Sequence, residues 1–475
     1  MVRYVFTQNT RSNMMNKSAV LLVFFALFSF GTLYAQKPLS MKEALKIGIE
    51  NYGTIKAKTQ YAEASKISVE QAKRENLPNF NISAQQSFGT ANGQYGPLYG
   101  FNGLGVASSG PAFAQQNNTA VFGALYLTNI NWDFYAFGKA KEKVKTAQAI
   151  AAKDDKDLLQ EIFQHKVKIA SAYLNLIAAQ QLTDSYEKNL DRVDTFRRVV
   201  VVRALNGLIP GVDSSQANAE YSSAKILLTK ARDQEQEYSN QLSQLLGVTA
   251  QDYIVDSFFI TRIPRILADS VAAEKHPLLQ YYQSRINASD EQARYYKTTS
   301  YPAFTVVGAL QGRGSGFNSD YAINPGDFTQ NYWSSISPTR SNYLLGVGVS
   351  WNLTQPYRIA EQVKSQHLIS KGLQEEYALV DQQIKAQLKL SDSKIKNAIL
   401  IHNEAPIQVR AAADAYMQKS VLYKNGLTNL VDVTQTLYTL IRAETDRDIA
   451  NNNVWQALLL KAASTGEFSL FENQF

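Results

Sequence analysis

The stretch Asn206-Gly207-Leu208-Ile209-Pro210-Gly211-Val212-Asp213 recurs in related form 219 residues later, as Asn425-Gly426-Leu427-Thr428-Asn429-Leu430-Val431-Asp432. The same spacing relates other residues on both sides of it: Trp132 and Trp351, Gln216 and Gln435, Ala224 and Ala443, and Gly247 and Gly466. A constant spacing over about 115 residues means that the two copies align without a net gap. The chain is therefore internally duplicated.

The repeats extend upstream of these landmarks. Leu77-Pro78-Asn79-Phe80 matches Tyr301-Pro302-Ala303-Phe304 at a spacing of 224. The segment between this motif and Trp132 or Trp351 therefore differs in length between the two copies, and it is expected to contain a loop. The predicted organisation is a signal peptide (1–35), a first repeat (36–250), a linker (251–269), a second repeat (270–466) and a C-terminal tail (467–475).

The amino terminus has the pattern of a secretory signal, with Lys17 before an apolar run and Leu33-Tyr34-Ala35 at a plausible cleavage site. No later stretch offers the roughly 18 apolar residues of a membrane-spanning helix. The chain has no cysteine, which excludes disulfides and an acylated amino-terminal cysteine. Removing three basic residues with the signal lowers the net charge from +7 to +4, which is too small to indicate nucleic-acid binding.

Each repeat contains very long helical patterns. Between Gly138 and Leu205 there is neither proline nor glycine, and apolar residues recur at spacings of three and four, so one helix of ~100 Å is predicted. A second helix is expected from Gly211 to Leu246. The second repeat has the same pattern except at Pro406, where a kink or break is expected. Such narrow apolar stripes favour side-by-side packing as coiled coils.

Each repeat also contains two runs in which apolar and polar residues alternate. The apolar members are Phe80, Ile82, Ala84 and Phe88, then Phe122, Ala124, Tyr126, Ile130, Trp132 and Phe134, and in the second copy Phe304, Val306 and Leu310, then Tyr343, Leu345, Val347, Val349, Trp351 and Leu353. Their length and terminal aromatics are typical of transmembrane β-strands, although a strand on a soluble core alternates too. The Gly-, Asn- and Ser-rich connections 89–119 and 312–341, predicted to be surface loops, favour the membrane interpretation.

Four membrane strands cannot close a barrel, because an open edge in hydrocarbon leaves backbone groups unpaired and the smallest closed barrels have about eight strands. Several identical chains must therefore share one barrel. Two chains would supply eight strands and three would supply twelve, and the larger barrel leaves an open lumen, so a homotrimer is favoured.

The order of helix, Leu77-Pro78 strand, loop, strand and long helical hairpin with a Gly-Leu tip, all present twice, resembles the TolC-type outer-membrane efflux protein family over essentially the whole mature chain. The resemblance implies a mainly α fold: a homotrimer with a shared twelve-stranded barrel in the outer membrane and a coiled-coil tunnel in the periplasm. It implies a channel without catalysis or cofactor. Exported substrates would reach it from an inner-membrane transporter through a periplasmic adaptor protein.

In that family, acidic residues after the tips line a narrow periplasmic aperture, which implies this role for Asp213 and Asp432, with Tyr423 nearby. Symmetry copies would bring like charges together, raise their pKa values and attract cations. Each aspartate can also stabilise the start of the helix that follows it, and the two roles are compatible. Thr428 and Gln435 stand where family members often carry an arginine and a second aspartate.

The two tips carry a second implied role. Gly207 and Gly426 suit a helix end that requires positive φ. The resemblance implies that the exposed tips contact the adaptor; their other residues are Asn206, Leu208, Asn425 and Leu427. Trp132 and Trp351, at the strand-to-helix junctions, are expected at the membrane interface, with core packing as the alternative.

The four histidines, His165, His276, His367 and His402, offer no metal site, because none has a partner at ligand spacing. Most of them are expected to be solvated helix residues. The alternative to a channel is a periplasmic coiled-coil scaffold without a pore. An exported hydrolase is the least supported class, since no nucleophile, acid pair or metal cluster is visible. The sequence leaves the transported substrate open.

Overall fold

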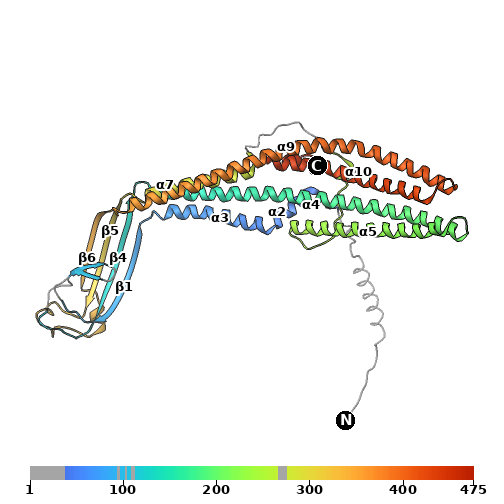
Figure 1. Ribbon diagram of the computed structural model, residues 1–475. Coiled ribbons are helices and arrows are strands. Elements are labelled where there is room, and N and C mark those ends of the chain that lie inside the picture. The colour runs from blue at the N-terminus through green and yellow to red at the C-terminus, as the bar shows by residue number, and fades with distance from the viewer. Residues whose placement is uncertain (1–37, 94–96, 102–103, 108–112, 266–274) are drawn as a thin grey trace, which may run out of the picture.

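The computed structural model describes residues 38–93, 97–101, 104–107, 113–265 and 275–475. The predicted signal peptide lies outside the described residues, as do the end of the predicted linker and the first residues of the second repeat. The molecule is elongated, with a β-sheet at one end from which long helices run to the opposite end (Figure 1).

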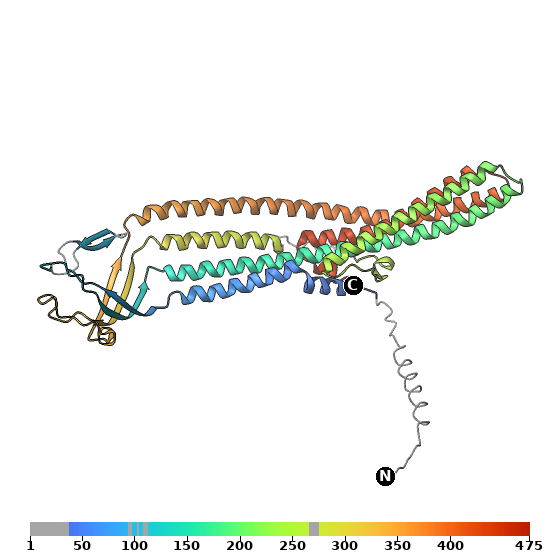
Figure 2. The ribbon, with the colours of Figure 1, turned by 90° about the horizontal axis from the view of Figure 1, so that it is seen from below.

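The helices repeat the duplication seen in the sequence. Those of the first repeat are α2 (Met41–Asn51), α3 (Gly53–Arg74), α4 (Lys139–Leu205) and α5 (Gly211–Leu246). Those of the second are α7 (Pro277–Thr298), α9 (Gln355–Lys424) and α10 (Leu430–Thr465), and the short helices are α6 (Phe258–Thr261), α8 (Tyr332–Ile336) and α11 (Ser469–Glu472). Helices α3 and α7 have 22 residues each, and α5 and α10 have 36 each. Figure 2 shows α3 and α7 beside the sheet-proximal halves of α4 and α9, while α5 and α10 cover the distal halves.

Helix α9 runs through Pro406 without the break that the sequence suggested. A proline inside a helix removes one backbone hydrogen bond and crowds the preceding turn. Here the neighbouring Ala405 is buried. Helix α9 packs along α10, and tertiary packing of this kind holds a helix in one piece where a local preference would break it.

The sheet is an antiparallel meander of four strands in the order β1 (Asn79–Gly89), β4 (Val121–Tyr135), β5 (Ala303–Ser315) and β6 (Arg340–Ser350). Its register aligns Trp132 of β4 with Val306 of β5, and Val306 with Val347 of β6. Because side chains alternate along a strand, these residues share one apolar face, as the alternation predicted. The opposite face carries polar and charged side chains, including Asp133 and Arg313. Within the described part of the chain, β1 and β6 each have only one strand partner.

The connections at the far end of the sheet contain more structure than the sequence indicated. A two-stranded sheet of β2 (Pro97–Phe101) and β3 (Leu104–Ala107) lies within the first loop. The second loop contains α8, and β5 continues to Ser315, so the glycine-rich stretch 312–315 is strand. Short elements of this kind are below the length at which periodicity is informative.

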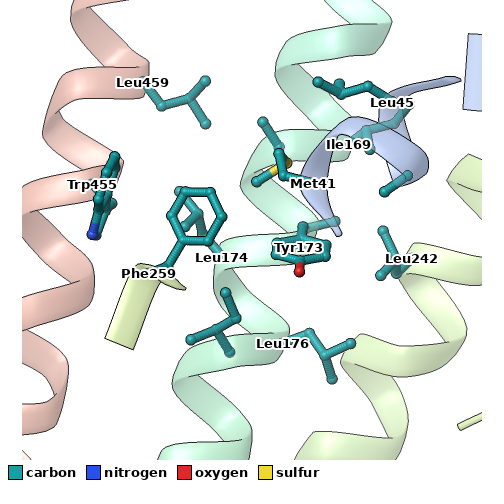
Figure 3. Close-up of a cluster of buried hydrophobic side chains, with 14 of the residues drawn as sticks. Met41, Leu45, Ile169, Tyr173, Leu174, Leu176, Leu242, Phe259, Trp455 and Leu459 are labelled. Atoms are coloured by element: carbon teal, nitrogen blue, oxygen red, sulfur yellow. The ribbon is translucent and has the colours of Figure 1, made fainter. Parts of the chain in front are cut away.

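The main core gathers buried side chains from α2, α4, α5, α6 and α10 (Figure 3). Tyr173 of α4 is fully buried, and its hydroxyl donates to the carbonyl of Leu39 (2.5 Å) and accepts from the N–H of Asp256 (3.2 Å). Burial raises the pKa of Tyr173 to about 12. The Trp455 indole donates to the carbonyl of Arg262 (2.9 Å). The described part of the segment between the repeats is therefore anchored in this core.

Two histidines are buried in the same region, which corrects the expectation of solvated side chains. His165 is fully buried, and its ring stacks on Tyr52 with 3.7 Å between the ring centroids. His276 begins α7: Nδ1 accepts from the N–H of Leu278 (3.1 Å), so Nε2 carries the proton and donates to the carbonyl of Ala463 (3.0 Å). Burial lowers the pKa of both histidines. Their neighbours come from other helices, and sequence spacing does not reveal them.

Helix α10 ends against His276 at Gly466, whose φ is +76°. A Cβ added to Gly466 would lie 2.7 Å from the His276 Cα and 2.8 Å from the Pro277 Cδ. Gly466→Ala is therefore expected to destabilise the protein by about 2 to 4 kcal/mol, through backbone strain and overlap. Gly372→Ala is the matched control, because an added Cβ meets nothing within 4 Å and the helix gains about 0.5 to 1 kcal/mol. Thermal unfolding of the detergent-solubilised protein measures both; equal midpoints for the two variants would contradict the packing described.

Candidate functional site

The two helical hairpins end side by side, at the end of the molecule farthest from the sheet (Figures 1 and 2). Both tips have the same backbone geometry. Gly207 and Gly426 have φ values of +70° and +75°, and the N–H of the following residue, Leu208 or Leu427, bonds the carbonyl five residues earlier at 2.9 Å. This is the hydrogen-bonded helix ending that favours glycine, and it fixes the direction in which each leucine leaves the helix.

The residues of the tips divide into two groups. The amides of Asn206 and Asn425 donate to carbonyls in the last turn of their own helices, at 2.9 and 3.0 Å. Leu208 and Leu427 are 68% and 72% exposed. The asparagines and glycines therefore build the turns, and the leucines form the accessible apolar surface.

Tyr423 and Asp213 are brought together, although they belong to different repeats. Tyr423, at the end of α9, is buried, and its hydroxyl donates to Oδ2 of Asp213 on α5 at 3.3 Å. Burial, and then the adjacent carboxylate, raises the pKa of Tyr423 to about 12, so it is a neutral hydrogen-bond donor at neutral pH. The pair links the end of α9 to the start of α5.

Arg203 of α4 completes this link, and the sequence analysis did not identify it. One guanidinium nitrogen donates to the carbonyls of Tyr423 (3.2 Å) and Lys424 (3.3 Å), the last of α9, and the guanidinium lies 5.7 Å from the Tyr423 ring centroid. A cation at a helix carboxyl end is stabilised by the free carbonyls there. The only signal in the sequence was a basic residue in the last turn before a tip.

Asp432 has different partners. Its Oδ2 accepts from Lys419 Nζ (2.8 Å) and from Thr428 Oγ1 (2.8 Å), and its N–H donates to the Asn429 side chain (2.9 Å), which caps α10. Lys419 lowers the pKa of Asp432, whereas symmetry copies gathered around an axis would raise it. Within one chain, Asp432 thus belongs to the start of α10, and Asp213 and Asp432 occupy different electrostatic surroundings.

Trp132 and Trp351 lie at the helical end of the sheet and make equivalent bonds. The indole of Trp132 donates to the carbonyl of Asn76 (2.9 Å), and that of Trp351 donates to the carbonyl of Ser300 (3.1 Å). Each bond joins the end of one strand to the turn that precedes the neighbouring strand. The rings remain partly or largely exposed, as aromatic side chains at a membrane interface are.

The described ranges contain no group of three or more His, Cys, Asp or Glu side chains that could hold a metal ion. Among the helices of these ranges, none is both long and apolar enough to cross a bilayer.

Comparison with known proteins confirms the resemblance inferred from the sequence. The family model of outer membrane efflux proteins matches residues 48–248, from within α2 to just past α5. No curated protein sequence matches the chain significantly.

Solved structures share the fold at low sequence identity. VceC from Vibrio cholerae is 14% identical with a TM-score of 0.72, covering 90% of this chain and 96% of its own. CusC is 11% identical with a TM-score of 0.74, covering 92% and 96%. The open state of the Neisseria gonorrhoeae MtrE outer membrane channel is 12% identical with a TM-score of 0.69, covering 91% and 90%. The predicted mainly α fold with four strands per chain is thereby confirmed.

Proposed function

Taking the chain as an outer membrane efflux protein, the family whose model matches its first repeat, we infer that it is a channel-tunnel that conducts exported substrates across the outer membrane. One observation carries the inference. The four-stranded sheet has one apolar and one polar face and ends in the strands β1 and β6, each paired on one side. A sheet with these properties suits a segment of a barrel wall, with lipid on the apolar side and water on the polar side.

Closure of that wall requires further copies of the chain. Unpaired backbone groups at a sheet edge cost several kcal/mol each in hydrocarbon, so β6 of one chain would pair with β1 of the next. Three copies of four strands give a twelve-stranded barrel, wide enough for a lumen. The long helices would then form the wall of a periplasmic tunnel that continues this lumen.

We further propose that the hairpin tips form the periplasmic end of the tunnel. Asp213, Asp432 and Tyr423 would lie at its aperture, and the exposed Leu208 and Leu427 would contact a periplasmic adaptor coupled to an inner-membrane transporter. The contacts of Arg203 and Tyr423 support this, because they join the two hairpins of one chain at the point where an aperture must open and close.

Conductance separates this function from a coiled-coil scaffold without a pore. The channel is expected to be extracted from outer membranes only with detergent, to migrate as a heat-modifiable trimer, and to produce ion-conducting steps in planar bilayers. A protein that purifies without detergent and leaves bilayers silent would be a scaffold.

The adaptor proposal makes a prediction about the two exposed leucines. Replacing both Leu208 and Leu427 by serine removes two apolar anchors, each contributing about 1 kcal/mol or more to an interface, so capture of the adaptor should fall by roughly tenfold or more. Cross-linking in cells, followed by purification of the trimer, measures the captured adaptor.

The matched control for this experiment is Ile323→Ser, because Ile323 is also a largely exposed aliphatic residue but lies in the loop at the opposite end of the molecule. All variants must reach the outer membrane at the same level. Undiminished capture by the double-serine variant would show that the adaptor contacts another surface.

A further inference from the structure

Helix α8 lies on the apolar face of the sheet, close to the end farthest from the long helices. Its Tyr332 hydroxyl donates to Oε1 of Gln86 on β1 (2.7 Å), and the Tyr332 ring packs edge-on against Phe122 of β4 with 5.1 Å between centroids. Gln86 pairs with Ala124, and Phe122, Ala124 and Trp132 are separated by even numbers of residues on β4, so their side chains lie on the same face of the sheet. The helix therefore covers the face that carries the apolar side chains, and not the face with Asp133 and Arg313.

Two glycines of β5 make room for this helix. A Cβ on Gly314 would lie 2.7 Å from the carbonyl oxygen of Ser335, and one on Gly312 would lie 3.4 Å from the Pro338 Cβ. Ser335 and Ile336 are buried by the contact. The segment is thus packed against the apolar face of the sheet, over the two central strands β4 and β5. A neighbouring copy of the chain that pairs with an edge strand, β1 or β6, would therefore not cover it.

The distance between α8 and the tryptophans at the helical end of the sheet matches the thickness of a membrane. Phe122, the ring beneath Tyr332, lies ten residues from Trp132 on the same strand and face. Ten residues span about 33 Å along a strand, or ~25 Å along the membrane normal at a tilt of ~40°. This is the height of the apolar band of an outer-membrane barrel. If Trp132 marks the periplasmic interface, α8 lies at the outer one.

The outward side of α8 has the chemistry of that interface. Trp333 is 73% exposed, its ring packs edge-on with Tyr332 at 5.1 Å, and the helix sequence Tyr-Trp-Ser-Ser-Ile has no charged residue. Indole and phenol rings with one polar group settle at the level of lipid headgroups.

We propose that α8 is a lipid-binding anchor on the outside of the barrel, with Trp333 inserted among the lipids of the outer leaflet. The proposal depends on the barrel inferred above. It adds a lipid contact that comes from the loop and not from a strand. A membrane is favoured over a second protein because the exposed aromatic lies at one membrane thickness from Trp132 on an apolar wall.

Spin labels test the proposal in the full trimer in liposomes, since a chain without cysteine accepts one label at a chosen site. A nitroxide at Trp333→Cys should be reached by oxygen more readily than by a water-soluble nickel complex, at a depth near the headgroups. Val347→Cys, on the apolar face, should be deeper, and Ile323→Cys, in the same loop as α8, should be open to the nickel complex.

The two control positions identify what fails. If Trp333→Cys is as accessible to nickel as Ile323→Cys, the anchor is refuted while the barrel stands. If Trp333→Cys is shielded from both reagents, the ring is packed against protein, which also refutes the lipid contact. If Val347→Cys is open to water, the barrel itself is wrong.

Discussion

Leu345→Arg is expected to prevent the chain from assembling in the outer membrane. Leu345 lies on the apolar face of β6, is 78% exposed in the single chain, and comes six residues before Trp351. Six residues of a tilted strand place it ~15 Å from the interface, near the centre of the bilayer. An arginine facing lipid at this depth costs about 2 to 4 kcal/mol, and a trimer would contain three. The measurement is the amount of heat-modifiable trimer in the outer-membrane fraction.

Leu344→Arg is the matched control, because the same residue type is replaced one position away on the opposite face. Leu344 is 66% exposed and shares its face with Asn342 and Arg313. In a barrel this face borders the water-filled lumen, so the variant should assemble normally and shift ion selectivity towards anions. Equal loss of trimer in both variants, or in neither, would show that the sheet does not separate lipid from water.

The contrast between the two leucines could be predicted from the sequence, because strand alternation depends only on neighbours in the chain. The long helices were equally readable, since the stretch between Gly138 and Leu205 contains no residue that ends a helix. Of the kink or break expected at Pro406, the break does not occur, because α9 packs along α10 and tertiary packing outweighs a local preference. Sequence patterns were therefore reliable for strands and helices, whose formation depends mainly on residues close together in the chain.

The details of the candidate site were less accessible to sequence analysis. The duplication located both tips and both aspartates, but not their partners. Lys419 lies thirteen residues before Asp432, on another helix, and Arg203 of the first repeat contacts Tyr423 of the second. The contact of α8 with the apolar face joins residues 246 positions apart. No periodicity encodes such pairs, since they depend on how the finished elements meet.

The aspartate and lysine pair leads to the second large effect. If Asp432 lines the aperture, three copies of its carboxylate should bind a multivalent cation that blocks the channel. Asp432→Asn removes these charges and should weaken the block by about tenfold or more, because each carboxylate attracts the cation directly. Lys419→Met is the opposite change. It leaves the carboxylate without its cationic partner and should strengthen the block.

The pH dependence of the block distinguishes an effect at Asp432 from a general change in shape. Lys419 holds the pKa of Asp432 below its usual value, so the carboxylate keeps its charge, and the block persists, to a lower pH than for an aspartate without a cationic partner. Without the lysine the pKa of Asp432 rises, because the carboxylate loses the hydrogen bond and the positive charge that stabilise its ionised form. The block of Lys419→Met should therefore be lost at a higher pH than that of the unmodified channel. Single-channel recordings with a multivalent cation on the side of the tips measure both quantities. Block that is unchanged in Asp432→Asn would remove Asp432 from the aperture, and it would leave the residue with the local role that its bonds to Lys419, Thr428 and the start of α10 already describe.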